Sequence, residues 1–464
     1  MFARMIHRLP AAGALFALLC LAQTALATPE IQTWRTEAGA KVLFVAAPDL
    51  PMLDIRVALD AGSGRDGERP GIASLTAGLL TQGAGDWDAD TIAERVESIG
   101  AQISTSTDRD MTSASLRGLT DPAALETAVA TLTQVLSNPS FNPKDVERLK
   151  RNRLTALRQA EQDPGTVGSK ALYRAVFGDH PYASDPSGTA ESVEQLGPED
   201  FKQFHRNYYR ASGATIALVG AIDRAQAEAI AESISAGLPQ GQAPPPLPPV
   251  TALDAGESRI IHFPSSQTHL YAGAPGMQRG DPDYFPLYVG NHILGGSGLV
   301  SLLMEEVREK RGLSYSVYSY FLPLAQPGPF VLGLQTKNAQ AEQAREVLLG
   351  TLKQFVSDGP SEEQLADAVK NITGGFPLRI ASNAKIVSYL AVIGFYDLPL
   401  DHLERFNERV RAVTREQIRD AFQRRVQPEN LRIVMVGQPE KGETDASAGQ
   451  TTAPEKAGSD AGTL

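Results

Sequence analysis

The sequence predicts an α+β protein of two homologous domains, each an antiparallel-rich sheet covered by helices. The first observation is an internal repeat: Val193 to Gly220 aligns without a gap on Val410 to Gly437, at an offset of 217. A second, shorter match places Ala130 to Ser137 on Gly350 to Ser357 at an offset of 220. The third observation is a proline-rich stretch, residues 238–252, between the two copies.

The longer repeat has the same internal pattern in both copies. An amphipathic helical segment is followed by a turn and then by an alternating apolar strand, Thr215 to Val219 in one copy and Arg432 to Val436 in the other. A glycine closes each strand. We therefore expect two α+β units that face each other as a clamshell, although a repeat alone is equally compatible with two similar domains that share no site.

Composition divides the chain further. The stretch from Leu238 to Val250 holds six prolines in thirteen residues, which favours an extended linker of roughly 40 Å. The linker separates an N-terminal domain, residues 28–237, from a C-terminal domain, residues 253–438. The segment 439–464 has no aromatic residue and almost nothing apolar, so it is expected to be a disordered tail.

The first 27 residues have the pattern of a secretory signal peptide. Arg4 and Arg8 precede an apolar run from Ala11 to Ala22, and the small-residue sequence ending at Ala27 suits cleavage there. That run is too short to span a bilayer, so no membrane anchor is expected. The lone Cys20 would leave with the signal. We expect an exported, most simply periplasmic, chain without disulfides.

The charge balance excludes one class of partner. The chain has 43 basic and 54 acidic residues, a net charge of −11, and loss of the two signal-peptide arginines would make it −13. An acidic chain is not expected to bind nucleic acid or an anionic membrane.

Several stretches, in order, resemble the pitrilysin-like zinc metallopeptidases, the family of insulysin and mitochondrial processing peptidase. They are the segment from Gly62 to Ala73, the sequence from Gly178 to Tyr182, the repeat from Val193, and the run from Ile293 to Val317. The resemblance covers nearly the whole chain after the signal peptide. It implies two facing half-barrel domains and a chamber for a peptide substrate.

The family's zinc motif is missing at the matching positions. Active members carry H-x-x-E-H on one helix, where two histidines bind zinc and the glutamate is the general base, and a second glutamate downstream. Here the histidine and base positions match Ser74, Ala77 and Gly78, and the downstream glutamate matches Ala156. Serine is a poor zinc ligand and the others offer no side-chain donor. No zinc is expected in this chain.

The remaining histidines do not restore a site. After the signal peptide they are His180, His205, His262, His269, His292 and His402. No two lie three or four residues apart, so none can form a ligand pair on one helix face. A structural or surface role is expected for each.

A second part of the family's site is present. Arg308 and Tyr315, seven positions apart, resemble the Arg/Tyr pair that the C-terminal half contributes across the chamber. The pattern predicts a helix that contains Arg308, a C-terminal cap at Gly312, and a strand from Tyr315 to Phe321. Such a pair would stabilise the negative oxygen formed as water attacks a peptide carbonyl. From spacing alone, Arg308 could simply complement a helix end and Tyr315 be an ordinary strand residue.

These observations lead to one hypothesis and one rival. The first is the non-catalytic subunit of a heterodimeric, exported zinc endopeptidase, whose homologous partner carries H-x-x-E-H and the zinc. The rival is a catalytically inactive peptide-binding or scaffold protein of the same fold. The surrounding charges, from Glu305 to Arg311, are expected to form a solvated helix face, and Gly295, Gly296 and Gly298 a close-packed turn or a backbone edge for an added peptide strand.

Overall fold

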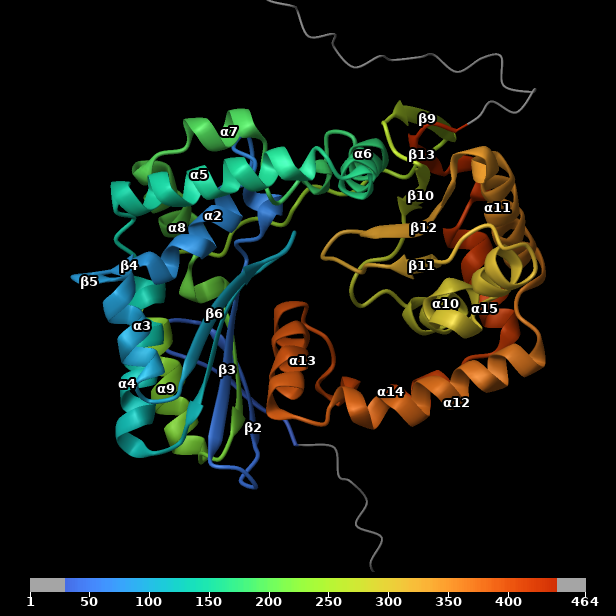
Figure 1. Ribbon diagram of the computed structural model, residues 1–464. Helices are drawn as coiled ribbons and strands as arrows, with labels where there is room; N and C mark the ends of the chain where they lie inside the picture. Colours follow the sequence, from blue (N-terminus) through green and yellow to red (C-terminus); the bar gives the residue numbers. More distant parts are fainter. Residues whose placement is uncertain (1–29, 440–464) are drawn as a thin grey trace, which may run out of the picture.

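The chain folds into two lobes, each built on one sheet with helices outside it (Figure 1). The structure is a computed structural model and describes residues 30–439. The expected signal peptide and the tail beyond residue 439 lie outside the described residues. The α+β prediction with two homologous domains is confirmed, and neither sheet closes into a barrel.

The N-terminal lobe contains a six-stranded sheet in the order β1-β2-β8-β3-β7-β6. Its strands are β1 (Gln32–Arg35), β2 (Lys41–Ala46), β3 (Met52–Leu59), β6 (Gln102–Thr107), β7 (Thr112–Leu119) and β8 (Thr215–Gly220), with a small hairpin of β4 (Gly83–Ala84) and β5 (Trp87–Asp88). Its helices are α2 (Ile72–Leu79), α3 (Ala89–Glu97), α4 (Pro122–Ser137), α5 (Pro143–Ala160), α6 (Pro164–Phe177), α7 (Ala190–Gln195), α8 (Pro198–Tyr208) and α9 (Arg224–Gly237).

The C-terminal lobe contains a five-stranded sheet in the order β11-β12-β10-β13-β9. Its strands are β9 (Glu257–His262), β10 (Gln267–Pro275), β11 (Val317–Phe321), β12 (Pro329–Lys337) and β13 (Arg432–Gly437). Its helices are α10 (Tyr284–Asn291), α11 (Ala341–Asp358), α12 (Glu362–Arg379), α13 (Asn383–Phe395), α14 (Phe406–Arg411) and α15 (Arg415–Arg425), with wide π-type turns at η5 (His292–Gly296) and η7 (Met304–Glu309).

The internal repeat is a structural repeat. Helix α8 and strand β8 of the first lobe have the bounds of α15 and β13 of the second, moved by 217 residues. The strand order also corresponds, since β2, β8, β3, β7 and β6 match β9, β13, β10, β12 and β11. Each sheet has one parallel pair at the same place, β2 with β8 and β9 with β13, and is otherwise antiparallel. Only the first lobe has an extra edge strand, β1.

The two lobes exchange a helix. Helix α6 of the first lobe packs on β10 and β13 of the second, and α13 of the second packs on β8, β3 and β2 of the first. Figure 1 shows α13 lying against the N-terminal sheet between the two lobes. The clamshell is therefore joined through its cores as well as through the linker.

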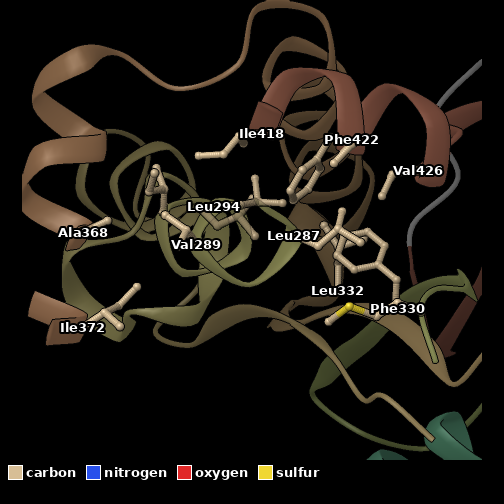
Figure 2. Close-up of a cluster of buried hydrophobic side chains, with 14 of the residues drawn as sticks. Leu287, Val289, Leu294, Phe330, Leu332, Ala368, Ile372, Ile418, Phe422 and Val426 are labelled. Atoms are coloured by element: carbon tan, nitrogen blue, oxygen red, sulfur yellow. The ribbon is translucent and has the colours of Figure 1, made fainter. Parts of the chain in front are cut away.

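Because of this exchange, two of the apolar cores contain residues from both lobes. One cluster combines Leu43, Ala58 and Ala217 of the first sheet with α13 residues such as Leu390. A smaller cluster combines Leu172 and Val176 of α6 with Val434 and Val436 of β13. Deep in the second lobe, Phe422 and Ile418 of α15 meet Leu287 and Leu294 near Phe330 (Figure 2). Burial of this kind is the main stabilising contribution to folding.

The proline-rich linker between α9 and β9 is held along its backbone. Arg65 donates to the Pro245 carbonyl oxygen at 2.7 Å, and Ser212 donates to the Gly241 oxygen at 2.7 Å. His180 Nε2 lies 2.9 Å from the Pro248 oxygen. Many of the linker side chains are exposed, but these bonds fix its path across the first lobe.

Among residues 30–439 no single helix is long and apolar enough to cross a membrane. Helices α12 and α13 are long and apolar enough only when taken together, and a bend of 107° separates them.

Candidate functional site

Arg308 and Tyr315 lie on either side of a tight helix end. The Gly312 amide donates to the Arg308 oxygen at 2.8 Å and the Leu313 amide to the Val307 oxygen at 2.9 Å, with Gly312 at φ 61°. These two bonds close the helix end around Gly312, which adopts the left-handed conformation that glycine favours at such ends. The predicted cap at Gly312 is thus confirmed. The predicted helix around Arg308 is present as the wide turn η7.

The predicted strand start at Tyr315 is wrong by two residues. Ser314 Oγ accepts from the Ser316 amide at 3.1 Å and donates toward the Gln335 and Ser316 carbonyl oxygens. These local bonds hold residues 314–316 in a side-chain-stabilised turn, so the ladder of β11 begins only at Val317.

The two side chains border one cavity. A cavity of about 420 Å³ is lined by Arg308 and Tyr315, by the glycine-rich segment before η7, and by β11 residues through Tyr320. Tyr315 is 83% exposed. Leu299, another wall residue, and its neighbour Val300 are also exposed large apolar residues. The structure thus brings a guanidinium and an exposed phenol to one concave surface.

The neighbouring charges pair with one another. Lys310 Nζ lies 2.9 Å from Glu305 and 2.6 Å from Glu306, and Arg311 lies 2.7 Å from Glu306. The hydrogen bond from Lys310, followed by that from Arg311, lowers the pKa of Glu306. These side chains form the solvated helix face that was expected. Arg308 takes no part in this network, and its one ion-pair contact among the described residues is with Glu309 at 3.7 Å.

The glycine-rich segment is a close-packed turn. A Cβ atom at Gly295 would lie 2.5 Å from the Ser319 amide nitrogen, which leaves no room for a side chain. Asn291 Nδ2 donates to the Ser319 oxygen at 3.1 Å, and Ser319 Oγ bonds Asn291 Oδ1 at 2.8 Å. Because Asn291 and Gly295 cover β11 at Ser319, a peptide cannot add as a strand there. Gly295 and Gly296 are therefore close-packed as expected, whereas a Cβ atom at Gly298 would meet nothing within 4 Å.

The positions that match the zinc motif lie on α2 and α5, which pack together. Ser74 Oγ donates to the Pro186 oxygen at 2.7 Å, so its hydroxyl ties α2 to the loop before α7. Ala77 is buried, and a Cβ at Gly78 would be 3.2 Å from a Leu149 methyl group. Ala156 is exposed on α5. These four residues supply no imidazole or carboxylate, so they do not fit a zinc ion.

The start of α2 is held by a buried carboxylate instead. Asp66 accepts from the Gly71 amide at 2.8 Å and from the Ala73 amide at 3.0 Å, which satisfies the free N–H groups of the helix end. Burial raises the pKa of Asp66 to about 7 against the opposing effect of these bonds. The positive charge of Arg153 on α5 also acts to lower this pKa.

Within the described part of the chain, no three His, Cys, Asp or Glu residues are grouped as metal ligands would be. His205 is a satisfied structural histidine: its Nε2 lies 2.7 Å from the Leu136 oxygen, and it is 5% exposed. Burial lowers its pKa to about 4.

Sequence reasoning missed a buried junction between the lobes. Asp110, 3% exposed, accepts from the Tyr182 hydroxyl at 2.5 Å and from the Tyr396 hydroxyl at 2.8 Å. It also accepts from the Ala325 amide of the β11–β12 hairpin at 2.7 Å. The run from Asp108 to Asp110 between two strands was the available signal, but it does not reveal contacts with residues more than 200 positions away.

The fold and these residues define the class of protein: a two-domain, peptidase-like chain in which serine, alanine and glycine occupy the metal-ligand positions. Comparison with known proteins then places it. Residues 41–190 match the family model "Insulinase (Peptidase family M16)", and residues 195–372 match "Peptidase M16 inactive domain". The chain therefore belongs to peptidase family M16, which confirms the resemblance found in the sequence.

Individual relatives agree. The structure superposes on a crystal structure described as a peptidase M16 inactive domain from Pseudomonas fluorescens, with a TM-score of 0.86 and 38% identity over 89% of this chain and 99% of the other. The chain is also 27% identical to "Non-peptidase homolog YmxG" of Helicobacter pylori, over 87% of this chain and 93% of the relative. "Uncharacterized zinc protease YmxG" of Bacillus subtilis is 24% identical over 77% of this chain and 86% of the relative. An inactive-type M16 homologue fits a non-catalytic role.

Proposed function

We propose that this chain is the non-catalytic subunit of a heterodimeric, exported zinc endopeptidase. A homologous partner that carries H-x-x-E-H would hold the zinc. This chain would supply Arg308 and Tyr315, together with half of the chamber that encloses the peptide.

The observation that carries the proposal is the shared cavity of Arg308 and Tyr315. The phenol is exposed, and the guanidinium lies outside the ion-pair network of its own helix. Fixed donors aimed at a developing negative oxygen stabilise it more than they stabilise the ground-state carbonyl. A structural pair would instead be expected to bond to its own fold.

This chain lacks the metal ligands and the general base that peptide hydrolysis in this family uses. Ser74, Ala77, Gly78 and Ala156 offer no ligand set and no general base, so hydrolysis at this fold needs a second chain. Zinc in such a partner would supply a Lewis acid and an activated water. The exposed Leu299 and Val300 beside Tyr315 give an apolar surface that a partner or a peptide could cover.

The alternative is a peptide-binding or scaffold protein that kept the cavity and lost catalysis. The name "Non-peptidase homolog" given to the Helicobacter relative favours it. The two functions differ in one respect: only the first requires Arg308 and Tyr315 for turnover.

The test is kinetic and uses the complex with an exported H-x-x-E-H chain from the same host. Tyr315→Phe should lower kcat about 10²- to 10³-fold, the usual cost of removing one oxyanion donor. Arg308→Ala should cost at least as much, with part of the loss in KM if the guanidinium also binds the substrate. Full turnover by both variants in an intact complex would favour the scaffold alternative.

Matched controls separate chemistry from assembly. Tyr208→Phe removes a phenol from α8 of the other lobe, and Arg311→Ala removes a cation from the same helix end as Arg308. Both should leave kcat within about twofold, because neither residue lines the cavity of Arg308 and Tyr315, and the exposed ion pair of Arg311 contributes little to stability. Zinc content, complex affinity and melting temperature should be equal across all four variants.

A further inference from the structure

A second cavity adjoins the first at the junction of the lobes. It has a volume of about 320 Å³ and is lined by Arg109 from the β6–β7 turn, by Lys170, Tyr173 and Arg174 of α6, and by Tyr320 of β11. Tyr320 also lines the cavity of Arg308 and Tyr315. The two cavities therefore meet at Tyr320, which belongs to the C-terminal lobe, and the other lining residues of the second cavity belong to the N-terminal lobe.

The Arg109 side chain is held in place by one hydrogen bond and by stacking on an aromatic ring. Its Nε donates to the backbone carbonyl oxygen of Tyr182 at 3.0 Å, and its guanidinium lies over the Tyr173 ring at 3.7 Å from the centroid. Within residues 30–439 no hydrogen bond is made by its two terminal nitrogens. A guanidinium fixed in this way presents a planar pair of donors, the geometry that binds a carboxylate. Burial lowers the pKa of Arg109, so a nearby anion would relieve a desolvated charge.

The charges around this cavity do not balance. Asp185 is the one carboxylate among its lining residues: it lies 2.5 Å from Lys170 and accepts from the Ser187 amide at 2.8 Å, and its charge raises the pKa of Arg109 against the larger effect of burial. Arg174 is exposed and makes no ion pair with a described residue. With Arg109, Lys170 and Arg174 set against Asp185, the lining carries two positive charges in excess, in a chain whose net charge is −11.

We propose that this cavity binds a carboxylate of the peptide that occupies the neighbouring cavity of Arg308 and Tyr315. The identity of the ligand as a peptide rests on the proposed function. Strands advance about 3.3 Å per residue, so a carboxylate beside Tyr320 lies within about five extended residues of the group beside Tyr315. The carboxylate can be the C-terminus of the peptide or an Asp or Glu side chain, because both present the same two oxygens.

Binding to the chain alone, without its partner, tests the proposal separately from catalysis. The probes are four decapeptides of one extended sequence, each labelled with the same uncharged fluorophore, with either Glu or Gln at one internal position and with either a free C-terminus or an amide. Anisotropy should show the Gln amide peptide binding at least about tenfold more weakly than a peptide that keeps the right carboxylate, since charge-assisted bonds are the strong ones. Whichever singly charged peptide binds tightly identifies the source. Equal affinities, or no binding by any of the four, would overturn the proposal.

A charge-matched pair of variants assigns the effect to this cavity. Arg174→Gln removes an exposed cation that has no ion-pair partner among the described residues, so folding should be unaffected, and the carboxylate preference should fall several-fold. Lys353→Gln makes the same change in charge at an exposed position of α11 and should leave the preference intact. Equal preference in Arg174→Gln and Lys353→Gln would overturn the proposal. The outcome of this binding experiment does not affect the turnover test of Tyr315. Conversely, a negative turnover test would not change the measured preference for a carboxylate.

Discussion

The two lobes share a backbone plan but fill one corresponding core position differently. His205 of α8 and Phe422 of α15 are equivalent under the offset of 217. His205 bonds the Leu136 oxygen near the end of α4, whereas Phe422 packs against Phe355 with ring centroids 4.9 Å apart. The same helix and strand therefore accept a polar or an apolar residue, provided that the polar one finds a partner. At this position the two halves therefore share backbone geometry but not the polarity of the buried side chain.

The largest effect is expected when Phe422 of the second lobe is replaced by histidine, the residue at the corresponding position of the first lobe. Phe422→His should destabilise the protein by about 3–5 kcal/mol, because the ring loses its packing and a buried N–H gains no acceptor. Phe422 is 0% exposed, and a Cβ at Gly290 would lie 2.5 Å from its ring, so the site has no spare room for water. Urea unfolding measures the change. A cost below about 1 kcal/mol would mean that the two positions are interchangeable after all.

The next test uses pH. His205 has a folded pKa of about 4, below its ordinary value, because burial disfavours the charged ring. Between about pH 6.5 and 4 the unfolded state binds a proton that the folded state does not, so stability should fall by about 3 kcal/mol as pH drops through this window. His205→Phe should abolish that loss while costing about 1–3 kcal/mol at pH 7, because the Leu136 oxygen loses its donor.

The titration of Asp66 changes stability in the opposite direction, so its contribution must be separated from that of His205. Its raised pKa means that the folded state binds a proton first, so its contribution to stability grows as pH falls from about 7 to 4. The difference between the unfolding curves of the native protein and His205→Phe cancels this effect. If that difference is flat from pH 7 to 4, His205 is not the titrating group.

A smaller effect is expected at the junction between the lobes. Asp110→Asn should cost about 2 kcal/mol, since it weakens charge-assisted bonds from the Tyr182 and Tyr396 hydroxyls without leaving a hole. Tyr396→Phe should cost less, and the double variant should cost less than the sum, because both changes remove the same bond. Additive costs would show that the two groups do not interact.

The smallest effect is expected for a cut in the linker. A protease site inserted between Gly241 and Gln242 should give two fragments on a denaturing gel but one species of unchanged size by gel filtration. The exchanged helices α6 and α13, rather than the linker, hold the lobes together. Separation of the fragments under native conditions would contradict this account.

The repeat was predictable because two segments of the chain carry the same helix and strand pattern without a gap, and each pattern is local. The exchange of α6 and α13 was not predictable in this way. An apolar stripe such as Leu172 and Val176 shows that a helix is buried on one face, but not which sheet covers that face.

The candidate site was predictable in part. The cap at Gly312 follows from local geometry, and the family resemblance located Arg308 and Tyr315. The start of β11 was misjudged because the hydroxyl of Ser314 competes with the strand ladder. Asp110 and Arg109 were missed because their partners are distant in sequence: Tyr396 of the other lobe bonds Asp110, and Tyr182 and Tyr173 hold Arg109.

The helix exchange also bears on how such a chain could have arisen by duplication. A single half would leave its sheet uncovered where the other half's helix now packs, and its own exchanged helix would have no sheet to cover. Two copies of one half related by a twofold axis would satisfy both needs at once. The present chain has the architecture of a domain-swapped homodimer whose two protomers are joined in one polypeptide, so that its two halves can carry different side chains at corresponding core positions.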